Sequence, residues 1–305
     1  MVEIIKDPKV IAAIIAAITS IITIFILKPF IEKRLFKFKL VEEHKYQQRK
    51  LIKEVLAKNK INLLNSAEQL NHRFWNFRNN HSKNWHLVKG DYFNKKNYYF
   101  NSFIYRILSF FAWIKITNKE MIFIDTTIAT KDDLFFIKYL QIFPQIMCDL
   151  FLFEGFEYDS NSSSDHFFRN DFENIITTLI ENEVVVDYAK YLNKLDNEMG
   201  NLKEQYSRLC NFLDGLSPNE KRLRFDRLQL LHLTIIAFLN KYGYDFQYTD
   251  KEKIIKIIQK PRISKLIDNY EKLIIRGKLN KEKEMRRLLE IVKTLPNKKY
   301  SAYRN

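Results

Sequence analysis

The densest run of apolar positions lies near the N-terminus, where Val10–Leu27 ("VIAAIIAAITSIITIFIL") holds eighteen residues without a charge. As a helix this segment is about 27 Å long, which approaches the thickness of the hydrocarbon core of a thin bilayer. It is longer than the apolar region of a typical secretory signal, and it ends at Lys28-Pro29 rather than at a small-residue cleavage site. The pattern predicts a single transmembrane helix; a buried core helix and a cleaved signal peptide are the alternatives.

The charges on the two sides of this segment differ. The twelve residues 28–39 carry five Lys or Arg and one Glu, whereas the four charges among the first nine residues nearly cancel. Because the more basic flank of a membrane helix stays in the cytoplasm, the positive-inside rule places the N-terminus outside. The remainder is then expected on the cytoplasmic side of a bacterial inner membrane.

Helical periodicity continues along most of the chain. No Gly or Pro occurs between Pro29 and Gly90, and the whole chain has only six of each, too few for a strand-rich fold. The fold class predicted is all-α: an anchor or pore helix at 1–29, a stalk helix at 30–70 and a cytoplasmic helical bundle at 71–305. Local signals predict helix starts at Thr130, from a capping box with Asp133, and at Ser217–Glu220 ("SPNE"). Residues 183–188 and 121–129 are the strand-like runs.

Small residues mark one side of the predicted membrane helix. At about 100° per residue, Ala12, Ala16, Thr19 and Thr23 fall close together on the helical wheel, with Ser20 at the edge. Small side chains at this spacing let helices approach closely in lipid, and hydroxyls can bond across the interface. The same stripe can line a narrow pore in an oligomer. The alternative is that these residues are simply tolerated in a membrane helix.

Aromatic and basic residues interleave in "HRFWNFRNNHSKNWHLVKGDYF", residues 72–93. Arginine binds phosphate oxygens and tryptophan stacks on bases, so this composition indicates a nucleotide or oligonucleotide site. The alternative is a half-buried helix with a basic outer face. The candidate ligand-binding residues are Arg73, Trp75, Arg78, Trp85, His86 and Lys89.

Enzyme motifs are few in this basic chain, which has a net charge of +15 and two cysteines. Glycine-rich nucleotide loops, zinc-protease motifs and serine-hydrolase motifs are absent from it. We predict neither catalytic residues nor a metal or cofactor. Two patterns keep an enzymatic alternative open: Arg227 and His232 match the Arg-x4-His spacing of HEPN-type ribonucleases, and Asp165–Glu173 groups carboxylates with a histidine. A core helix and a capped helix start are the competing interpretations.

The predicted membrane helix with its Ala12, Ala16, Thr19 and Thr23 stripe, followed by a helical basic remainder, resembles the membrane effectors of bacterial anti-phage systems. The layout is most similar to the channel-forming effector of the Hailong system. That resemblance implies a homo-oligomer, specifically a tetramer, whose gated pore responds to an oligonucleotide made by a nucleotidyltransferase partner and halts growth of the infected cell by abortive infection. A tethered ribonuclease using Arg227 and His232, and a non-catalytic membrane-anchored adaptor, are the rival functions.

Overall fold

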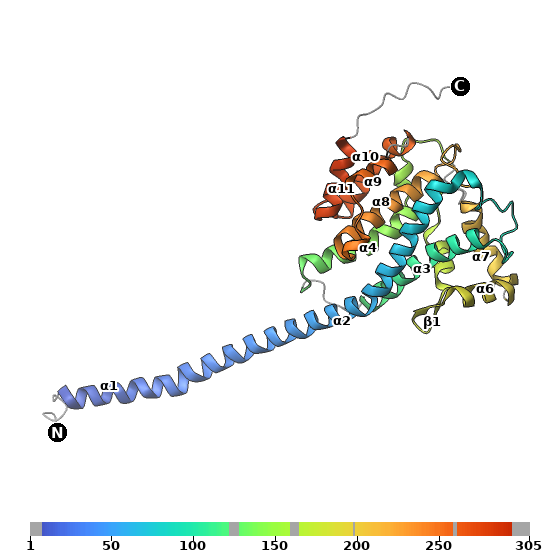
Figure 1. Cartoon of the computed structure of the whole chain (residues 1–305). Coiled ribbons are helices and arrows are strands. Elements are labelled where there is room, and N and C mark those ends of the chain that lie inside the picture. The colour runs from blue at the N-terminus through green and yellow to red at the C-terminus, as the bar shows by residue number, and fades with distance from the viewer. Residues whose placement is uncertain (1–7, 122–127, 159–164, 198, 259–260, 295–305) are drawn as a thin grey trace. The chain divides into compact units, whose positions relative to one another are not determined.

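The computed structural model describes residues 8–121, 128–158, 165–197, 199–258 and 261–294, with the backbone alone at 197, 199–203, 261–265 and 294. The described chain is helical apart from one two-stranded hairpin (Figure 1), so the predicted all-α class is confirmed. The chain divides into two compact units. The first is Met1–Glu54 with Ile124–Ala129, and the second is Val55–Phe123 with Thr130–Asn305.

The first unit begins with helix α1, Pro8–Ile22, which continues through a π-helical turn, η2 (Thr23–Leu27), into α2. In the turn the backbone N–H of Lys28 donates to the Thr23 carbonyl, one residue further than in an α-helix. Every residue from 11 to 44 is exposed. The chain therefore carries a long, apolar and unburied helix near its N-terminus, as a membrane anchor or a signal sequence does. A buried core helix is not what the structure shows.

Helix α2 runs without interruption from Lys28 to Asn80. Its part in the second unit buries one face through apolar residues spaced three or four apart, the spacing that brings side chains to the same side of a helix. These residues are Leu63, Leu64, Ala67, Leu70, Phe74 and Phe77. The segment boundaries predicted at residues 29 and 70 were drawn from the sequence. The structure does not test them, so they stay predictions.

The core of the second unit is built around α8, Arg224–Tyr242, in which every residue from Arg224 to Leu239 is buried. Helices α4 (Lys131–Cys148), α10 (Pro261–Arg276) and α11 (Lys283–Thr294) pack against it. Helix α3, Tyr98–Met121, packs on α4 and α5 and is also largely buried. Aromatic rings fill much of the space, as where Phe143 of α4 meets Phe238 of α8 edge-on at 5.6 Å between centroids.

Shorter elements complete the second unit. The antiparallel hairpin pairs Ile180 with Val185 and Glu181 with Val184, and its two-residue turn has positive φ at Asn182 and Glu183. This confirms a strand within 183–188; most of the other strand-like run lies outside the described residues. The remaining elements are η3 (His81–Lys83), η4 (Leu150–Phe153), α5 (Arg169–Thr177), β1 (Ile180–Glu181), β2 (Val184–Val185), α6 (Tyr188–Asn197), α7 (Met199–Leu213), η5 (Asp245–Gln247) and α9 (Lys251–Ile258).

The two predicted helix starts have different outcomes. The capping box is confirmed: Thr130 Oγ1 accepts the Asp133 N–H at 3.2 Å, and Asp133 Oδ2 accepts the Thr130 N–H at 3.0 Å. The start at Ser217 is wrong, because α8 begins at Arg224 and residues 217–223 form turns. Glu220 accepts hydrogen bonds from the Ser217 N–H at 3.3 Å and from the buried Arg224 guanidinium, four residues further on, at 2.8 and 2.7 Å, so these local contacts form although no helix starts at Ser217.

Candidate functional site

The small-residue stripe of α1 is exposed along its whole length. Ala12, Ala16, Thr19 and Ser20 lie on α1, and Thr23 is the first residue of the π turn. Thr19 Oγ1 donates to the Ile15 carbonyl at 2.7 Å, and Thr23 Oγ1 donates to the Thr19 carbonyl at 2.8 Å. Both hydroxyl donors are therefore satisfied within one chain and need no partner on another helix. The remaining effect of the stripe is its small size, which lets another helix approach closely.

The candidate ligand-binding residues of α2 have separate surroundings. Arg73 is 6% exposed and donates from Nη2 to Ser102 Oγ at 2.8 Å. Arg78 is half-buried and donates to Gln229 Oε1 at 3.2 Å, and burial lowers the pKa of its guanidinium. Trp75 contacts the buried His232 ring edge-on at 5.0 Å. Neither arginine forms an ion pair with a carboxylate of the described residues, and Arg73 also lies over an aromatic ring, that of Tyr99.

The other candidates lie in the loop after α2. His86 is buried, and its Nε2 lies 2.7 Å from the Leu216 carbonyl. The Asp214 carboxylate accepts the backbone N–H groups of Val88 and Gly90 at 2.8 and 3.1 Å, with that of Lys89 at 3.3 Å. The His86 side chain and the Lys89 backbone thus tether the loop to the turn after α7. The Trp85 side chain stays 47% exposed.

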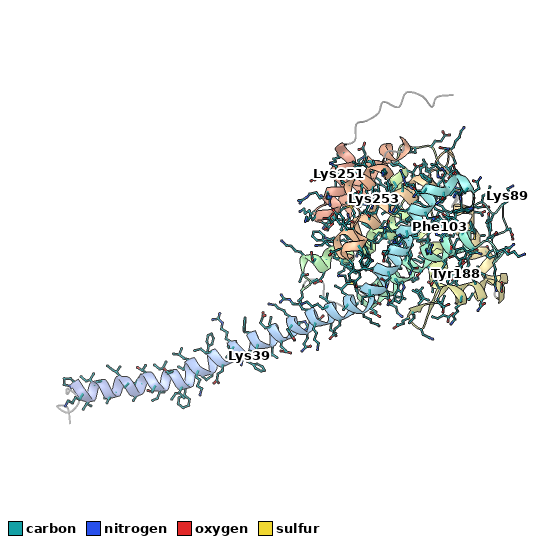
Figure 2. All side chains as sticks on the ribbon, in the orientation of Figure 1. Lys39, Lys89, Phe103, Tyr188, Lys251 and Lys253 are labelled. Atoms are coloured by element: carbon teal, nitrogen blue, oxygen red, sulfur yellow. The ribbon has the colours of Figure 1, made fainter. Side chains whose placement is uncertain are left out.

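Four residues gather around Arg73. Together the five form what we term the arginine–tyrosine cluster: Arg73, Tyr98, Tyr99, Arg106 and Tyr188. The Arg73 guanidinium lies over the Tyr99 ring at 4.3 Å. The Tyr98 and Tyr188 rings meet edge-on at 6.0 Å, and Tyr98 is 60% exposed. Tyr188 is labelled in Figure 2, on α6 of the second unit. The cluster thus joins α2, α3 and α6.

The cluster holds two cations and no carboxylate. Among the residues that the structure describes, no Asp or Glu forms an ion pair with Arg73 or Arg106. Burial, and after it the nearby charge of Arg73, lowers the pKa of the Arg106 guanidinium. Two like charges without a counter-ion are unfavourable in a partly buried site, and an anion between them relieves the repulsion.

Buried polar atoms of the cluster also lack partners. Arg73 Nε and Tyr188 Oη are both buried and make no hydrogen bond in the structure. Leaving a buried donor unpaired costs roughly 1–3 kcal/mol. Since Arg73 and Arg106 are donors only, an anionic group with several acceptor oxygens, such as a phosphate, matches what the cluster lacks.

An aromatic surface adjoins the cluster. The Trp85 ring lies 5.5 Å from the Tyr99 ring, and Lys83 Nζ lies 4.8 Å from the Trp85 ring centroid. The half-exposed indole is the type of surface on which a nucleobase stacks.

No protein-family model, curated protein or solved structure matches the chain. The functional argument therefore depends on the chain's own residues.

The sequence pattern identified Arg73 and Trp85 but missed Tyr98, Tyr99, Arg106 and Tyr188. Arg106 stands alone in the apolar run "FIYRILSFFAWI", Phe103–Ile114, which the sequence predicts as a core helix. A single charge in such a run was the signal that was available, because a buried charge is retained only where something compensates it.

The Arg-x4-His pair is buried in the core. Arg227 is 0% exposed, and its guanidinium donates to the carbonyls of Ile146, Asp149 and Asp165. His232 is also 0% exposed, with Nε2 2.8 Å from Asn71 Oδ1, and burial lowers its pKa to about 3. His232 is therefore neutral at physiological pH, and neither side chain of this chain reaches solvent to act on RNA.

The carboxylates around Asp165 are held in ion pairs. Asp165 Oδ1 accepts from Arg222 Nε at 3.0 Å, Glu173 pairs with Arg169 at 3.1 Å, and Asp171 pairs with Arg208. In the described part of the chain no group of three or more His, Cys, Asp or Glu residues is placed to hold a metal ion. The geometry supports a helix start with an acidic first turn at α5.

A separate cavity of about 540 Å³ lies between α3, α4 and α5. Its walls are mainly apolar, and the charges at its edge are paired: Lys119 with Glu183 at 3.1 Å, and Arg169 with Glu173. Cys148 lines it, and burial raises the pKa of the thiol to about 12, so the thiol is uncharged. Arg169 and Glu173 of the Asp165–Glu173 group line this cavity, whereas none of the predicted pore or ligand-binding residues does.

Proposed function

We propose that this protein is a single-pass inner-membrane effector of bacterial anti-phage defence that binds a nucleotide-derived anion and oligomerises into a gated pore. The observation that carries the proposal is the arginine–tyrosine cluster, where two arginines without carboxylate partners lie beside an exposed tryptophan. The resemblance to Hailong-type effectors supports the defensive role, the tetrameric state and a nucleotidyltransferase as the source of the ligand.

The connection between ligand and membrane rests on helix α2. Arg73 lies on this helix, whose first residue, Lys28, follows directly on the apolar helix and its π turn. A ligand gates the pore only if it binds one of two arrangements more tightly than the other. An anion that draws Arg73 and Arg106 together has such a preference, because it stabilises the arrangement in which both guanidinium groups reach it.

Replacement of Arg106 with glutamine should weaken binding of a short oligoadenylate about ten- to a hundredfold. The loss of one charge-assisted hydrogen bond costs roughly 1.5–3 kcal/mol. Arg106 is only partly buried and forms no ion pair in the described structure, so the change should leave folding intact. The measurement is fluorescence anisotropy of a labelled tetra-adenylate added to the full-length chain in detergent, with ATP and inorganic phosphate as competitors.

The matched control is R49Q, which removes one exposed arginine from the same long helix that carries Arg73. It should bind the probe as the unmodified chain does. Equal affinity of R106Q and the unmodified chain would place the ligand outside the cluster. Competition by phosphate as effective as that by ATP would remove the role of the base.

The proposed topology gives a second prediction. A reporter that is active only in the cytoplasm, fused after Asn305, should be active, and the chain should resist extraction by alkaline carbonate. The basic flank after Leu27 is the reason, since its five cations oppose translocation. Recovery of a shortened chain in the soluble fraction would mean that the apolar helix is a cleaved signal.

A further inference from the structure

The first fourteen residues of α2, Lys28–Val41, have a composition found nowhere else in the first unit. We term them the collar segment. Apolar and cationic side chains alternate irregularly along it, and all of them are exposed. The large apolar residues are Phe30, Ile31, Leu35, Phe36, Phe38, Leu40 and Val41. The cations are Lys28, Lys33, Arg34, Lys37 and Lys39, against Glu32 as the single acid.

Neither kind of side chain keeps to one side of the helix. At about 100° per residue, Lys28 and Lys37 point in opposite directions, and so do Phe36 and Phe38 to within about 20°. A helix that packs on one partner, or pairs in a coiled coil, needs a continuous apolar stripe. In the collar segment Ile31, Leu35 and Phe38 fall within about 60° of one another, but such a stripe leaves four other large apolar side chains outside it: Phe30, Phe36, Leu40 and Val41. An environment that surrounds the helix and offers both apolar and anionic groups on every side accounts for the pattern.

The cations of the collar segment have no counter-ions among the residues that the structure describes. Lys33, Lys37 and Lys39 form no ion pair in the described structure, whereas Lys45 pairs with Glu42 at 2.8 Å and Lys50 pairs with Glu54 at 3.8 Å further along α2. The excess of positive charge therefore ends where Glu42 and Glu43 begin. Lys39 is labelled in Figure 2.

We propose that the collar segment crosses the headgroup layer of the membrane and binds anionic phospholipid headgroups on all sides of the helix. The proposal rests on the membrane anchoring inferred above, because it needs Val10–Leu27 in the hydrocarbon core. Aromatic and aliphatic side chains then lie at the boundary of the acyl chains, and the lysine and arginine stems extend along them to the phosphates. Juxtamembrane cations attract anionic lipids in this way.

The test measures lipid preference in vesicles that contain the full-length chain. Spin-labelled phosphatidylglycerol and phosphatidylcholine are compared for the fraction of motionally restricted lipid. The unmodified chain should prefer phosphatidylglycerol about threefold or more, since one cation near an anionic surface favours association roughly fivefold and the lipid shell averages over strong and weak positions. K33Q/K37Q/K39Q should reduce the preference to about half or less, because only Lys28 and Arg34 of the five cations then remain.

The control is K45Q/K50Q/K53Q, which removes the same charge from the part of α2 beyond the collar segment and should keep the full preference. Equal restriction of the two lipids by the unmodified chain, or a preference that is unchanged in K33Q/K37Q/K39Q, would overturn the proposal. Binding of a labelled single-stranded RNA that only K33Q/K37Q/K39Q abolishes would also overturn it, in favour of nucleic acid. Flotation reports anchoring separately: a chain that fails to float with either vesicle contradicts the membrane anchor itself.

Discussion

Replacement of Arg227 with methionine should lower the free energy of unfolding by roughly 3–5 kcal/mol. Methionine fills a similar volume but supplies no donor, so the carbonyls of Ile146, Asp149 and Asp165 lose their shared partner inside the core. Each buried acceptor left unpaired costs roughly 1–3 kcal/mol. The packing of the guanidinium on the Phe153 ring, at 4.2 Å, is lost as well.

The expected loss is large because Arg227 joins two helices. The Ile146 and Asp149 carbonyls lie at the C-terminal end of α4, which leaves carbonyls without partners in its own helix. Arg224 has the same role at the end of α7, where Nη1 donates to the carbonyls of Asn211, Phe212 and Asp214 at 2.8–2.9 Å. The start of α8 thus caps two other helices with buried arginines.

Thermal unfolding followed by circular dichroism measures this effect, and a loss of this size lowers the melting temperature by roughly 10 °C in a domain of this length. The control R286M removes an arginine that is exposed on α11 and lies 3.9 Å from Glu290, so it should change stability by less than about 1 kcal/mol. The same measurement distinguishes the proposed effector from the ribonuclease alternative. A ribonuclease that uses Arg227 for catalysis predicts that R227M keeps its melting temperature and loses RNA cleavage.

The double substitution T19L/T23L should abolish growth arrest and membrane conductance while leaving membrane insertion intact. Thr19 and Thr23 lie one turn apart on the small-residue stripe, and in a pore they face the axis where helices approach or ions pass. Leucine places a bulky apolar side chain there. It does not weaken insertion, since leucine in the hydrocarbon core contributes about −0.3 to −0.6 kcal/mol. Growth of expressing cells and planar-bilayer currents of the purified chain measure the outcome.

Two control variants refine this test. I14L/I22L changes two positions outside the small-residue stripe and should have no effect. T19V/T23V keeps the branched shape and removes only the hydroxyls, which already bond to the Ile15 and Thr19 carbonyls of the same helix. Activity of the valine variant together with loss in the leucine variant indicates that close packing matters rather than polarity. Full activity of T19L/T23L would contradict the pore and favour the adaptor.

Local sequence signals determined the elements whose causes are local. The uncharged run from Val10 to Leu27 predicts an apolar helix, and the structure shows that helix unburied by the rest of the chain. A helix that is apolar on all sides needs an apolar environment, which a membrane supplies. The scarcity of glycine and proline predicts the all-α class, and the Thr130 capping box acts within three residues. These features can be predicted without knowing which distant segments of the chain pack together.

The tertiary structure alone decided which polar residues have partners. From sequence, Arg73, Arg106 and Arg227 are three similar arginines in helical segments. Packing places backbone carbonyls from α4 and the turn before α5 around Arg227, so it is satisfied inside the core. It places Arg73 and Arg106 among tyrosines, and no carboxylate of the described residues pairs with either. The free energy of a buried charge depends on groups far away in the chain, and for that reason local pattern could not tell the arginine that is satisfied in the core from the two that form no ion pair among the described residues.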